Sequence, residues 1–359
     1  EGAEGEAERE VVEPDVIRVV GNLLYVLNQY RGLTIVDLDT RALVAQAPTY
    51  GYPRDLYVVG NLAYVLTGYA ADFVAEGDTV KVEVGSRIYV LDVTDPAEAE
   101  VLTSFDLEGD FQDSRLVGDV LYAVSATFSW QYGEWDDTVS VGVGAVGKSW
   151  NKQQTSASWV TSINVADPEN IAVVDTLSFE GYGNIIQATN FAIFAAGYDW
   201  ESDETTITYV DIADAGGAIA VRGAAAVKGD VADRFKMDAY NGVLRVVSGT
   251  NWQNRQVYVT TIDLADPDNL AVLGETAIEG AAGETLFATR FDGPRAYIVT
   301  FLIVDPLFVI DLSDPANPVV AGTLEVPGWS THIEPRGDRL IALGVDDTEG
   351  TRRVCVSLF

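Results

Sequence analysis

The stretch that decides the fold is Leu56-Tyr-Val-Val-Gly60-Asn61-Leu-Ala-Tyr-Val-Leu66, which is followed by Asp92-Val-Thr-Asp95-Pro96. In the first phrase, two runs rich in Val, Tyr and Leu flank a Gly-Asn pair, which supplies the positive φ angles of a two-residue hairpin turn. In the second, an Asp-x-x-Asp-Pro turn ends an apolar strand. The two phrases predict a unit of four antiparallel strands, A to D: A and B joined by the hairpin, a variable loop, then C and D joined by the Asp turn.

Both phrases recur along the chain. The hairpin pair returns as Gly21-Asn22, Gly118-Asp119, Asn241-Gly242, Asp292-Gly293 and Gly337-Asp338. The Asp turn returns as Asn164-Val-Ala-Asp167-Pro168, Asp211-Ile-Ala-Asp214, Asp263-Leu-Ala-Asp266-Pro267 and Asp311-Leu-Ser-Asp314-Pro315, with a degraded form at Asp37-Leu-Asp39-Thr40. Four-stranded units repeated in this way are typical of a β-propeller, and we expect an all-β fold of seven four-stranded antiparallel blades with almost no helix. A parallel β-helix is the main alternative, but its rungs are shorter and lack hairpin turns.

The repeat sets the expected domain boundaries. We expect a single propeller domain over residues 14–359, preceded by an acidic N-terminal tether over residues 1–13 of the kind that follows a removed leader or lipid anchor. The blades begin near Asp15, Arg54, Asp113, Ile185, Lys236, Leu286 and His332. The seventh unit reaches Phe359 before its Asp turn and strand D. Either the segment Arg9 to Glu13 supplies the closing strand, or the natural chain continues past Phe359.

Composition excludes several classes of partner and site. Lys and Arg number 22 against 55 Asp and Glu, which gives a net charge of −33 and argues against binding nucleic acid or anionic lipid. No apolar run approaches the ~18 residues of a membrane span, so we expect no transmembrane segment. A single cysteine, Cys355, and a single histidine, His332, exclude a disulfide, a cysteine zinc cluster and a paired-His metal site.

Two further phrases carry a resemblance to a known family. Tyr25-Val-Leu-Asn28-Gln-Tyr-Arg-Gly32-Leu-Thr-Ile-Val-Asp37 resembles the LVIVD repeat. The stretch Tyr297-Ile-Val-Thr-Phe301-Leu-Ile-Val-Asp305-Pro-Leu-Phe-Val-Ile-Asp311-Leu-Ser-Asp-Pro315-Ala-Asn-Pro318 is similar to the secreted bacterial beta-propeller domain family, found in surface proteins and lipoproteins. The resemblance runs from about Pro14 to Phe359. It implies a propeller and an extracytoplasmic location in a bacterium, secreted or anchored to the cell surface, and it implies no activity.

Loop lengths indicate which end of each blade is used. Each blade has a turn end, with its A–B and C–D turns, and a loop end, with its B–C loop and D–A link; the loop ends surround the mouth of the central channel. The turn ends carry the same short hairpin and Asp turns in each blade. The B–C loops differ in length and include insertions at Tyr69 to Ser86 and Ala126 to Ser158. Tryptophan is common at interaction hot spots. We therefore predict a partner-binding surface at the loop ends, carried by Trp130, Trp135, Trp150, Trp200, Trp252 and Trp329; the alternative is that these rings only pack the insertions.

The starts of the A strands form a second candidate site at the channel mouth. The side chains expected there are Arg54, Asp55, Arg115, Gln187, Asp238, Arg290 and His332. Arginines in homologous register could bind an anion or a carboxylate, or they could bridge adjacent blades through neighbouring aspartates.

The chemistry-bearing residues favour binding over catalysis. The recurring Asp pairs are expected to cap their own turns, because no DxDxDG calcium loop is present; the acidic loops Asp199 to Glu204, Glu134 to Asp137 and Asp346 to Glu349 are better Ca²⁺ candidates. No GxSxG elbow frames a serine, so no catalytic residue is assigned and no cofactor is expected. We predict a non-catalytic binding or assembly module with a protein or cell-surface partner, or further copies of itself; the alternative is a propeller enzyme acting on a polar or carbohydrate substrate at the channel mouth.

Overall fold

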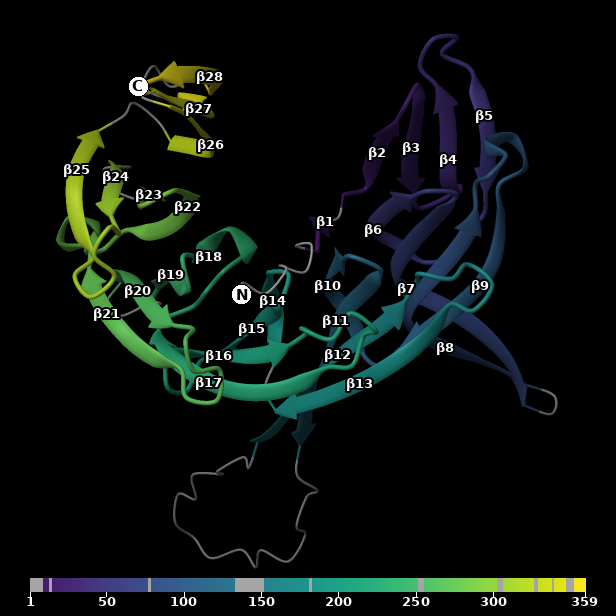
Figure 1. Ribbon diagram of the computed structural model, residues 1–359, viewed down its shortest axis with the longest axis horizontal. Helices are drawn as coiled ribbons and strands as arrows, with labels where there is room; N and C mark the ends of the chain where they lie inside the picture. The colour runs from purple at the N-terminus through teal and green to yellow at the C-terminus, as the bar shows by residue number, and fades with distance from the viewer. Residues whose placement is uncertain are drawn as a thin grey trace, which may run out of the picture. The chain divides into compact units, whose positions relative to one another are not determined.

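The computed structural model describes residues 9–12, 15–76, 79–132, 152–180, 183–250, 255–301, 306–325, 329–337, 339–346 and 352–359. These residues form seven antiparallel sheets (Figure 1), which confirms the predicted all-β fold. Among them the helical segments are three short 3₁₀ turns, Pro96–Glu98, Arg234–Lys236 and Glu279–Ala281. The chain divides into two compact units: the N-unit, Val12–Asn184, and the C-unit, Glu1–Val11 with Ile185–Phe359. A single domain over residues 14–359 stays a prediction.

The N-unit contains the first three sheets. The first sheet consists of β2 (Ile17–Val20), β3 (Leu23–Asn28), β4 (Gly32–Asp37) and β5 (Leu43–Ala47). The second consists of β6 (Tyr52–Val59), β7 (Leu62–Glu76), β8 (Thr79–Asp92) and β9 (Glu100–Leu107). The third consists of β10 (Asp110–Val117), β11 (Val120–Tyr132), β12 (Lys152–Asn164) and β13 (Ala172–Glu180), with β1 (Val11–Val12) beside β10.

The C-unit contains the other four sheets. The fourth sheet is β14 (Gly183–Ala188), β15 (Ala192–Asp199), β16 (Glu204–Asp211) and β17 (Ala220–Lys228). The fifth is β18 (Met237–Tyr240), β19 (Val243–Gly249), β20 (Val257–Asp263) and β21 (Ala271–Ala277). The sixth is β22 (Thr285–Asp292), β23 (Arg295–Phe301), β24 (Pro306–Asp311) and β25 (Val319–Glu325). The seventh has three described strands, β26 (Trp329–Arg336), β27 (Arg339–Asp346) and β28 (Arg353–Leu358).

The predicted hairpins form because their turn residues adopt the required backbone angles, and the cores form because apolar side chains of neighbouring sheets pack together. Gly60 adopts a φ of 56°, the left-handed conformation required by the β6–β7 turn, and Val59 pairs with Leu62 across it. Apolar side chains of neighbouring sheets then pack together: in the N-unit, Tyr64 and Ile88 of the second sheet share a buried cluster with Leu121 of the third. The blade starts predicted from the sequence coincide with, or lie within a few residues of, the first strands of the seven sheets.

The two long insertions contain strand where the sequence analysis expected loop. The β7–β8 ladder continues from Ala70↔Gly85 to Glu76↔Thr79, and the β11–β12 ladder continues from Thr127↔Ala157 to Tyr132↔Lys152. Beyond the four-stranded part, each hairpin is a two-stranded ribbon, because β6 pairs with β7 only as far as Gly68 and β10 pairs with β11 only as far as Ala126. We call these the β7–β8 ribbon and the β11–β12 ribbon. Both ribbons continue the backbone hydrogen-bond pattern of their hairpins.

The N-terminal segment lies elsewhere than on the seventh sheet. Val11 and Val12 form β1 beside β10, whereas closure of the seventh sheet by Arg9 to Glu13 was one of the two alternatives that the sequence left open. The physical reason is apolar burial, since Val12 packs against the cluster that contains Tyr57 and Leu116.

Candidate interaction surfaces

The carboxylates of the C–D turns bind the backbone of their own turns. Asp92 Oδ1 accepts a hydrogen bond from the Thr94 amide at 2.7 Å, and Asp95 Oδ1 accepts one from the Ala97 amide at 3.0 Å. Hydrogen bonds from the side chain and backbone of Thr94 lower the pKa of Asp92 because they favour its charged form. The pattern recurs at Asn164, Asp167, Asp211, Asp214, Asp263, Asp266, Asp311 and Asp314. The predicted hydrogen bonds from these side chains to the backbone amides of their own turns are therefore confirmed.

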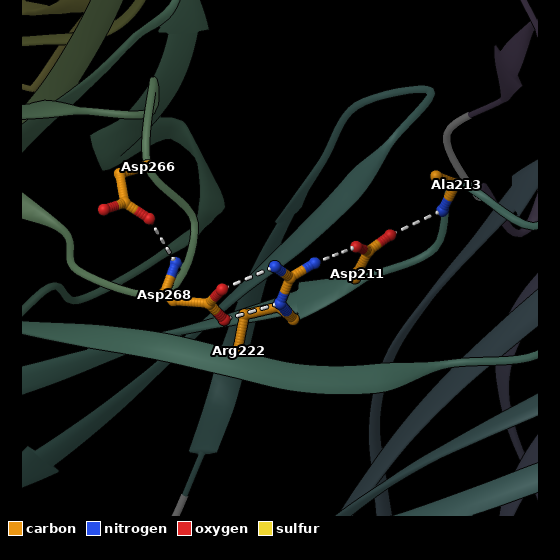
Figure 2. A network of polar contacts seen from close by, with 5 residues as sticks. All are labelled: Asp211, Ala213, Arg222, Asp266 and Asp268. Atoms are coloured by element: carbon orange, nitrogen blue, oxygen red, sulfur yellow. Dashed lines mark hydrogen bonds and ion pairs between the residues drawn. The ribbon is translucent and has the colours of Figure 1, made fainter.

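One of these turns also anchors a neighbouring sheet through Arg222 (Figure 2). From β17, the Arg222 guanidinium donates from Nε and Nη2 to both carboxylate oxygens of Asp268, at 2.6 and 2.7 Å, and from Nη1 to Asp211 at 2.8 Å. The hydrogen bond with Arg222 lowers the pKa of Asp268. Both carboxylates belong to C–D turns, Asp211 to the fourth sheet and Asp268 to the fifth. The Arg222 network therefore joins the fourth and fifth sheets at their turn ends, where solvent screening weakens such ion pairs.

Two glycines let the same turns approach the preceding sheet closely. A Cβ on Gly223 of β17 would lie 2.7 Å from the carbonyl oxygen of Pro267 in the next sheet's turn. A Cβ on Gly274 of β21 would lie 2.6 Å from the carbonyl oxygen of Pro315 and 2.7 Å from that of Ala316. No side chain fits at either position without moving backbone. We call such a position a glycine seat: a fourth-strand glycine covered by the C–D turn of the next sheet.

In the N-unit, Asp55 and Arg115, two of the residues predicted at the channel mouth, contact a group of buried and partly buried polar side chains. Ser114 donates from Oγ to the Asp55 carboxylate at 2.6 Å and lies 2.9 Å from the Tyr57 hydroxyl. Arg115 is 1% exposed and its guanidinium pairs with Asp113 at 2.7 Å. Burial raises the pKa of Tyr57 well above its usual value, with the charge of Asp55 adding to the effect.

Because Arg115 is buried and paired with Asp113, its guanidinium is not available to bind an anion from solvent. Arg54 is exposed, and its guanidinium lies over the Tyr52 ring at 5.4 Å from the centroid. Of the two arginines predicted at the channel mouth in this unit, Arg115 forms a buried ion pair and Arg54 is exposed.

In the C-unit, the predicted channel-mouth residues fall into two groups. Asp238 binds Arg245 within the fifth sheet. Arg290 and His332 both lie near the Glu334 carboxylate, at 3.7 and 4.0 Å. Gln187 is partly buried in β14 and joins neither group. The interpretation of arginines as bridges between sheets is supported here, since Arg290 on β22 pairs with Glu334 on β26.

Sequence analysis missed two buried cations of the C-unit. Lys236 is 2% exposed and donates to Asp233 at 2.6 Å and to the Phe287 carbonyl oxygen of the next sheet at 2.8 Å. Arg245 is 4% exposed, stacks on the rings of Tyr240 and Phe291, and donates to a carbonyl oxygen of the sixth sheet. A buried cation must be paired, so these contacts fix neighbouring sheets together.

Trp200 is the one predicted binding tryptophan whose side chain the structure describes. It is 56% exposed, on the turn between β15 and β16. That turn is braced, because Asp199 accepts hydrogen bonds from the Glu201 amide at 3.0 Å and the Ser202 hydroxyl at 2.9 Å, and Asp203 accepts one from Tyr198 at 2.7 Å. The ring is therefore displayed at the loop end of the fourth sheet by a fixed turn.

The other predicted tryptophans are only partly placed. Trp130 lies in β11 and Trp329 in β26 by their backbones, while Trp135, Trp150 and Trp252 lie outside the described residues.

Exposed tyrosine and phenylalanine side chains, as well as Trp200, lie mainly at the loop ends of the sheets. Among the described side chains, nine aromatic rings are exposed, and two of them, Phe191 and Tyr240, lie at turn ends. The other seven lie in B–C connections, in D–A links or at the start of a first strand: Tyr30, Tyr50, Tyr52, Tyr69, Trp200, Phe235 and Phe287. Tyr30 is 89% exposed and Tyr50 is 71% exposed. Tyrosines in B–C turns could have signalled this surface from the sequence.

A pocket of about 480 Å³ lies at turn ends in the C-unit. Its walls include the Asn190–Phe191 and Tyr240–Gly242 turns and the N-terminal segment, where Arg9 donates to the carbonyl oxygens of Asn190 and Ile212. The carboxylate in its lining is Glu10 alone, so the paired acids of glycoside cleavage do not meet here.

The described part of the chain contains no group of three or more His, Cys, Asp or Glu side chains placed to hold a metal ion. Of the acidic loops, Asp199 to Glu204 is described in full and its Asp199 and Asp203 carboxylates accept hydrogen bonds within the turn. Glu134 to Asp137 and most of Asp346 to Glu349 lie outside the described residues. Within the described ranges, no helix is long and apolar enough for a membrane span.

The chain that forms these seven antiparallel sheets matches the profile of a known domain. A family profile described as the beta propeller domain matches residues 6–359. The chain belongs to the beta propeller domain family. Its sheets are therefore blades, and the propeller part of the expected resemblance is confirmed. The LVIVD repeat and the secreted bacterial character are not.

The curated relatives of this propeller chain are archaeal. The uncharacterized protein MJ1554 of Methanocaldococcus jannaschii is 45% identical over 124 residues, which cover 34% of this chain and 20% of that protein. An uncharacterized protein of Archaeoglobus fulgidus is 41% identical over 134 residues, which cover 37% of this chain and 20% of that protein. The prediction of a bacterial surface location is wrong on this evidence, and none of the comparisons shows secretion.

Solved structures that match most of the chain at low similarity include two. Hsv2 of Kluyvelomyces marxianus has a TM-score of 0.44 at 10% identity, covering 94% of this chain and 93% of its own. The Cps50 (Swd1) beta-propeller domain of Myceliophteria thermophila has a TM-score of 0.42 at 11% identity, covering 98% of each chain.

Proposed function

We propose that this chain is a non-catalytic binding or assembly module that takes a protein partner, or further copies of itself, at the loop ends of its blades. The observation that carries the proposal is that, among the described side chains, seven of the nine exposed aromatic rings lie at the loop ends of the blades. Large rigid rings lose little conformational entropy on binding and are enriched at interaction hot spots. At the turn ends, by contrast, polar side chains form hydrogen bonds and ion pairs with one another, as in the Arg222 network (Figure 2).

The β7–β8 and β11–β12 ribbons also favour the loop ends of the blades as the site of partner contact. Past Gly68 and Ala126, each strand of the two ribbons pairs with one described strand, apart from Ala157, which also pairs with Glu180. Their outer edges are therefore available for backbone pairing. Two-stranded ribbons add little to fold stability, since an isolated hairpin is marginal in water. Their length is better explained by contact with a partner than by folding.

The acidic side chains predicted for the channel mouth support binding rather than chemistry. The Asp55 carboxylate accepts from Ser114, and the Asp238 carboxylate pairs with Arg245. A general acid or base needs a carboxyl group aimed at a substrate position, and these two are aimed at protein. We propose accordingly that the module works without a metal or other cofactor, and that Ca²⁺ at the acidic loops is not needed for folding.

The experiment compares a loop-end variant with a turn-end variant. The loop-end variant carries Tyr30→Ser, Tyr69→Ser and Trp200→Ser; the control carries Phe191→Ser and Tyr240→Ser, which remove exposed rings from the other ends. Both are used as bait in quantitative affinity capture from the source organism, after circular dichroism and thermal unfolding have shown that they fold. We expect the loop-end variant to lose about tenfold or more of the captured partner and the control to keep it. Equal capture by both variants, or a loss confined to the control, would contradict the proposal.

A further inference from the structure

Close backbone packing brings three segments of the N-unit together at the loop ends of the first and second blades. Gly32, the first residue of β4, has no room for a Cβ, because the Ala47 carbonyl oxygen and the Thr49 amide nitrogen occupy its place. Gly51 lies in the same way against Thr67 of β7, whose side chain would be 2.8 Å from a Cβ. The B–C turn of the first blade and the start of β7–β8 therefore both pack against the D–A link between the two blades.

An exposed tyrosine, or two, extends from each of these segments: Tyr30 from the B–C turn, Tyr50 and Tyr52 from the D–A link and the start of β6, and Tyr69 from β7. Their backbones are held in place by side chains beneath them. The Asn28 side chain accepts a hydrogen bond from the Tyr30 amide at 2.9 Å. The buried hydroxyls of Tyr89 and Thr67 donate to the Tyr50 carbonyl oxygen at 3.0 and 3.2 Å. The rings are thus presented by a backbone that is already ordered, which lowers the entropy cost of binding.

Tyr69 is presented at some cost in backbone strain. Its φ is 54°, in the left-handed region that disfavours a large side chain, and it lies in the bulge between Thr67 and Ala70 of the β7–β8 ladder. The ring is nevertheless 61% exposed, so its own burial does not offset the strain. Backbone strain of this kind is concentrated at functional sites.

Two exposed arginines add positive charge to these rings. The Arg54 guanidinium lies over the Tyr52 ring, and Gly68 leaves space for it, since a Cβ there would be 3.3 Å from Arg54 Nε. Arg31 follows Tyr30 and is exposed as well. Among the described residues neither arginine forms an ion pair, although acidic residues outnumber basic ones by 55 to 22 in the chain. We call Tyr30, Tyr50, Tyr52 and Tyr69, with Arg31 and Arg54, the Tyr–Arg surface.

We propose that the Tyr–Arg surface binds a short acidic segment of another protein, in which one or two Asp or Glu residues are flanked by aromatic residues or proline. The guanidinium groups of Arg31 and Arg54 donate to the carboxylates, and the tyrosine rings pack against the flanking apolar groups. Tyrosine and arginine are the residue types enriched where proteins bind one another. The inference rests on the proposed function, since it names the partner chemistry for one part of the loop-end surface.

Charge and the neighbouring ribbon decide between possible occupants. A second copy of the chain would bring a net charge of −33 to the contact, whereas a short segment brings only a few carboxylates to two cations. Charges farther away than the Debye length, ~8 Å at physiological ionic strength, are screened. Next to the surface, β7 pairs with β8 alone among the described strands from Ala70 to Glu76. An extended polypeptide can pair with that edge, and an acidic polysaccharide cannot.

The probe is a phage-displayed library of random peptides, selected on the immobilised wild-type chain. Enriched peptides are synthesised, and their dissociation constants are measured by fluorescence anisotropy for the wild type and for three variants. Arg31→Gln and Arg54→Gln each remove one charge from the Tyr–Arg surface. The control, Arg41→Gln, removes the same charge from an exposed position in the C–D turn of the first blade. Each peptide is also made with Asn for Asp and Gln for Glu.

We expect the enriched peptides to be acidic, and Arg54→Gln to weaken their binding about fivefold or more, with a smaller loss for Arg31→Gln and little change for Arg41→Gln. The amide versions of the peptides should bind the wild type about as weakly as the acidic versions bind Arg54→Gln. Selection without acidic enrichment, or equal binding by Arg54→Gln and Arg41→Gln, would overturn the proposal.

Two further measurements cover the other occupants. Binding of polygalacturonate that is lost in Arg54→Gln, without any acidic peptide, would assign the surface to an acidic polysaccharide and overturn the proposal. A wild-type dimer in sedimentation analysis that Arg54→Gln dissociates would assign it to a second copy and do the same. If the loop-end variant loses its captured partner while Arg54→Gln keeps that partner and shows no loss of peptide binding, the proposed function stands and the acidic chemistry alone is refuted.

Discussion

At the scale of single residues, Gly274 and Gly322 make a matched pair. They occupy the same register in adjacent sheets, but a Cβ on Gly274 meets backbone oxygens at 2.6 and 2.7 Å, while one on Gly322 meets nothing within 4 Å. We expect Gly274→Val to lower the free energy of unfolding by about 2 to 4 kcal/mol through overpacking against rigid backbone, and Gly322→Val to change it by less than about 0.5 kcal/mol. Urea unfolding measures both. Similar losses for the two variants would show that strand propensity, not the seat, decides the effect.

Two aspartates of the C-unit should respond to pH with opposite signs. Burial, with the charges of Asp203 and Asp233 adding to it, raises the pKa of Asp230, so its contribution to stability is full below the unfolded pKa and is lost as pH rises through the folded pKa. The hydrogen bond with Arg222 lowers the pKa of Asp268, so its contribution is present above the unfolded pKa and is lost as pH falls through the folded one.

Replacement by Asn removes both titrations. Relative to the wild type, Asp230→Asn should therefore gain stability at pH 7 compared with pH ~3.5, and Asp268→Asn should lose stability over the same interval. Urea midpoints at the two pH values measure the difference. Shifts of the same sign in both variants would contradict the assigned causes.

At the scale of elements, the ribbons should be separable from the blades that carry them. Residues 70–85 and 127–156 lie beyond the last described pairs of their sheets with β6, β9, β10 and β13. Replacing each by a two-residue turn therefore removes described pairing from the two-stranded ladders alone. We expect the shortened chain to keep its far-ultraviolet spectrum and to change its unfolding midpoint by a few degrees at most, because an isolated hairpin adds little stability. Loss of cooperative unfolding would mean that the ribbons belong to the core.

The elements also show what the sequence could and could not reveal. The hairpin at Gly60-Asn61 and the turn at Asp92 to Pro96 were predictable because local backbone chemistry determines them. The β11–β12 ribbon was missed because Lys152 to Ser158 is polar and Ser-rich, and a ladder propagates through backbone groups that leave no apolar pattern. The burial of Arg115 and Lys236 was missed as well. A charged side chain is buried only where a distant partner meets it, as the Phe287 carbonyl does for Lys236.

For the whole molecule, the net charge of −33 should dominate the response to salt. Like charges repel in the compact state, and screening removes much of that repulsion between about 20 and 500 mM NaCl. We expect the unfolding temperature to rise over that range. Ca²⁺ and Mg²⁺ chloride at matched ionic strength should raise it equally, because the described carboxylates form no cluster that could hold a metal. A further rise with Ca²⁺ alone, saturating at micromolar concentration, would place a specific site in the acidic loops.

The three-stranded seventh sheet has a consequence for the order in which the chain opens. In a linear array of coupled repeats, each repeat contributes its intrinsic stability and one interface term per neighbour. Val354, Val356 and Leu358 of β28 are 78%, 71% and 61% exposed, so this strand contributes little apolar burial to its sheet or to the interface with a neighbouring sheet. Native-state hydrogen exchange should therefore find β28 in the cooperative unit of lowest opening free energy within the C-unit, exchanging before the amides of β24, whose Phe308 and Ile310 are each 1% exposed. Sub-global opening of the C-unit would then begin at β28.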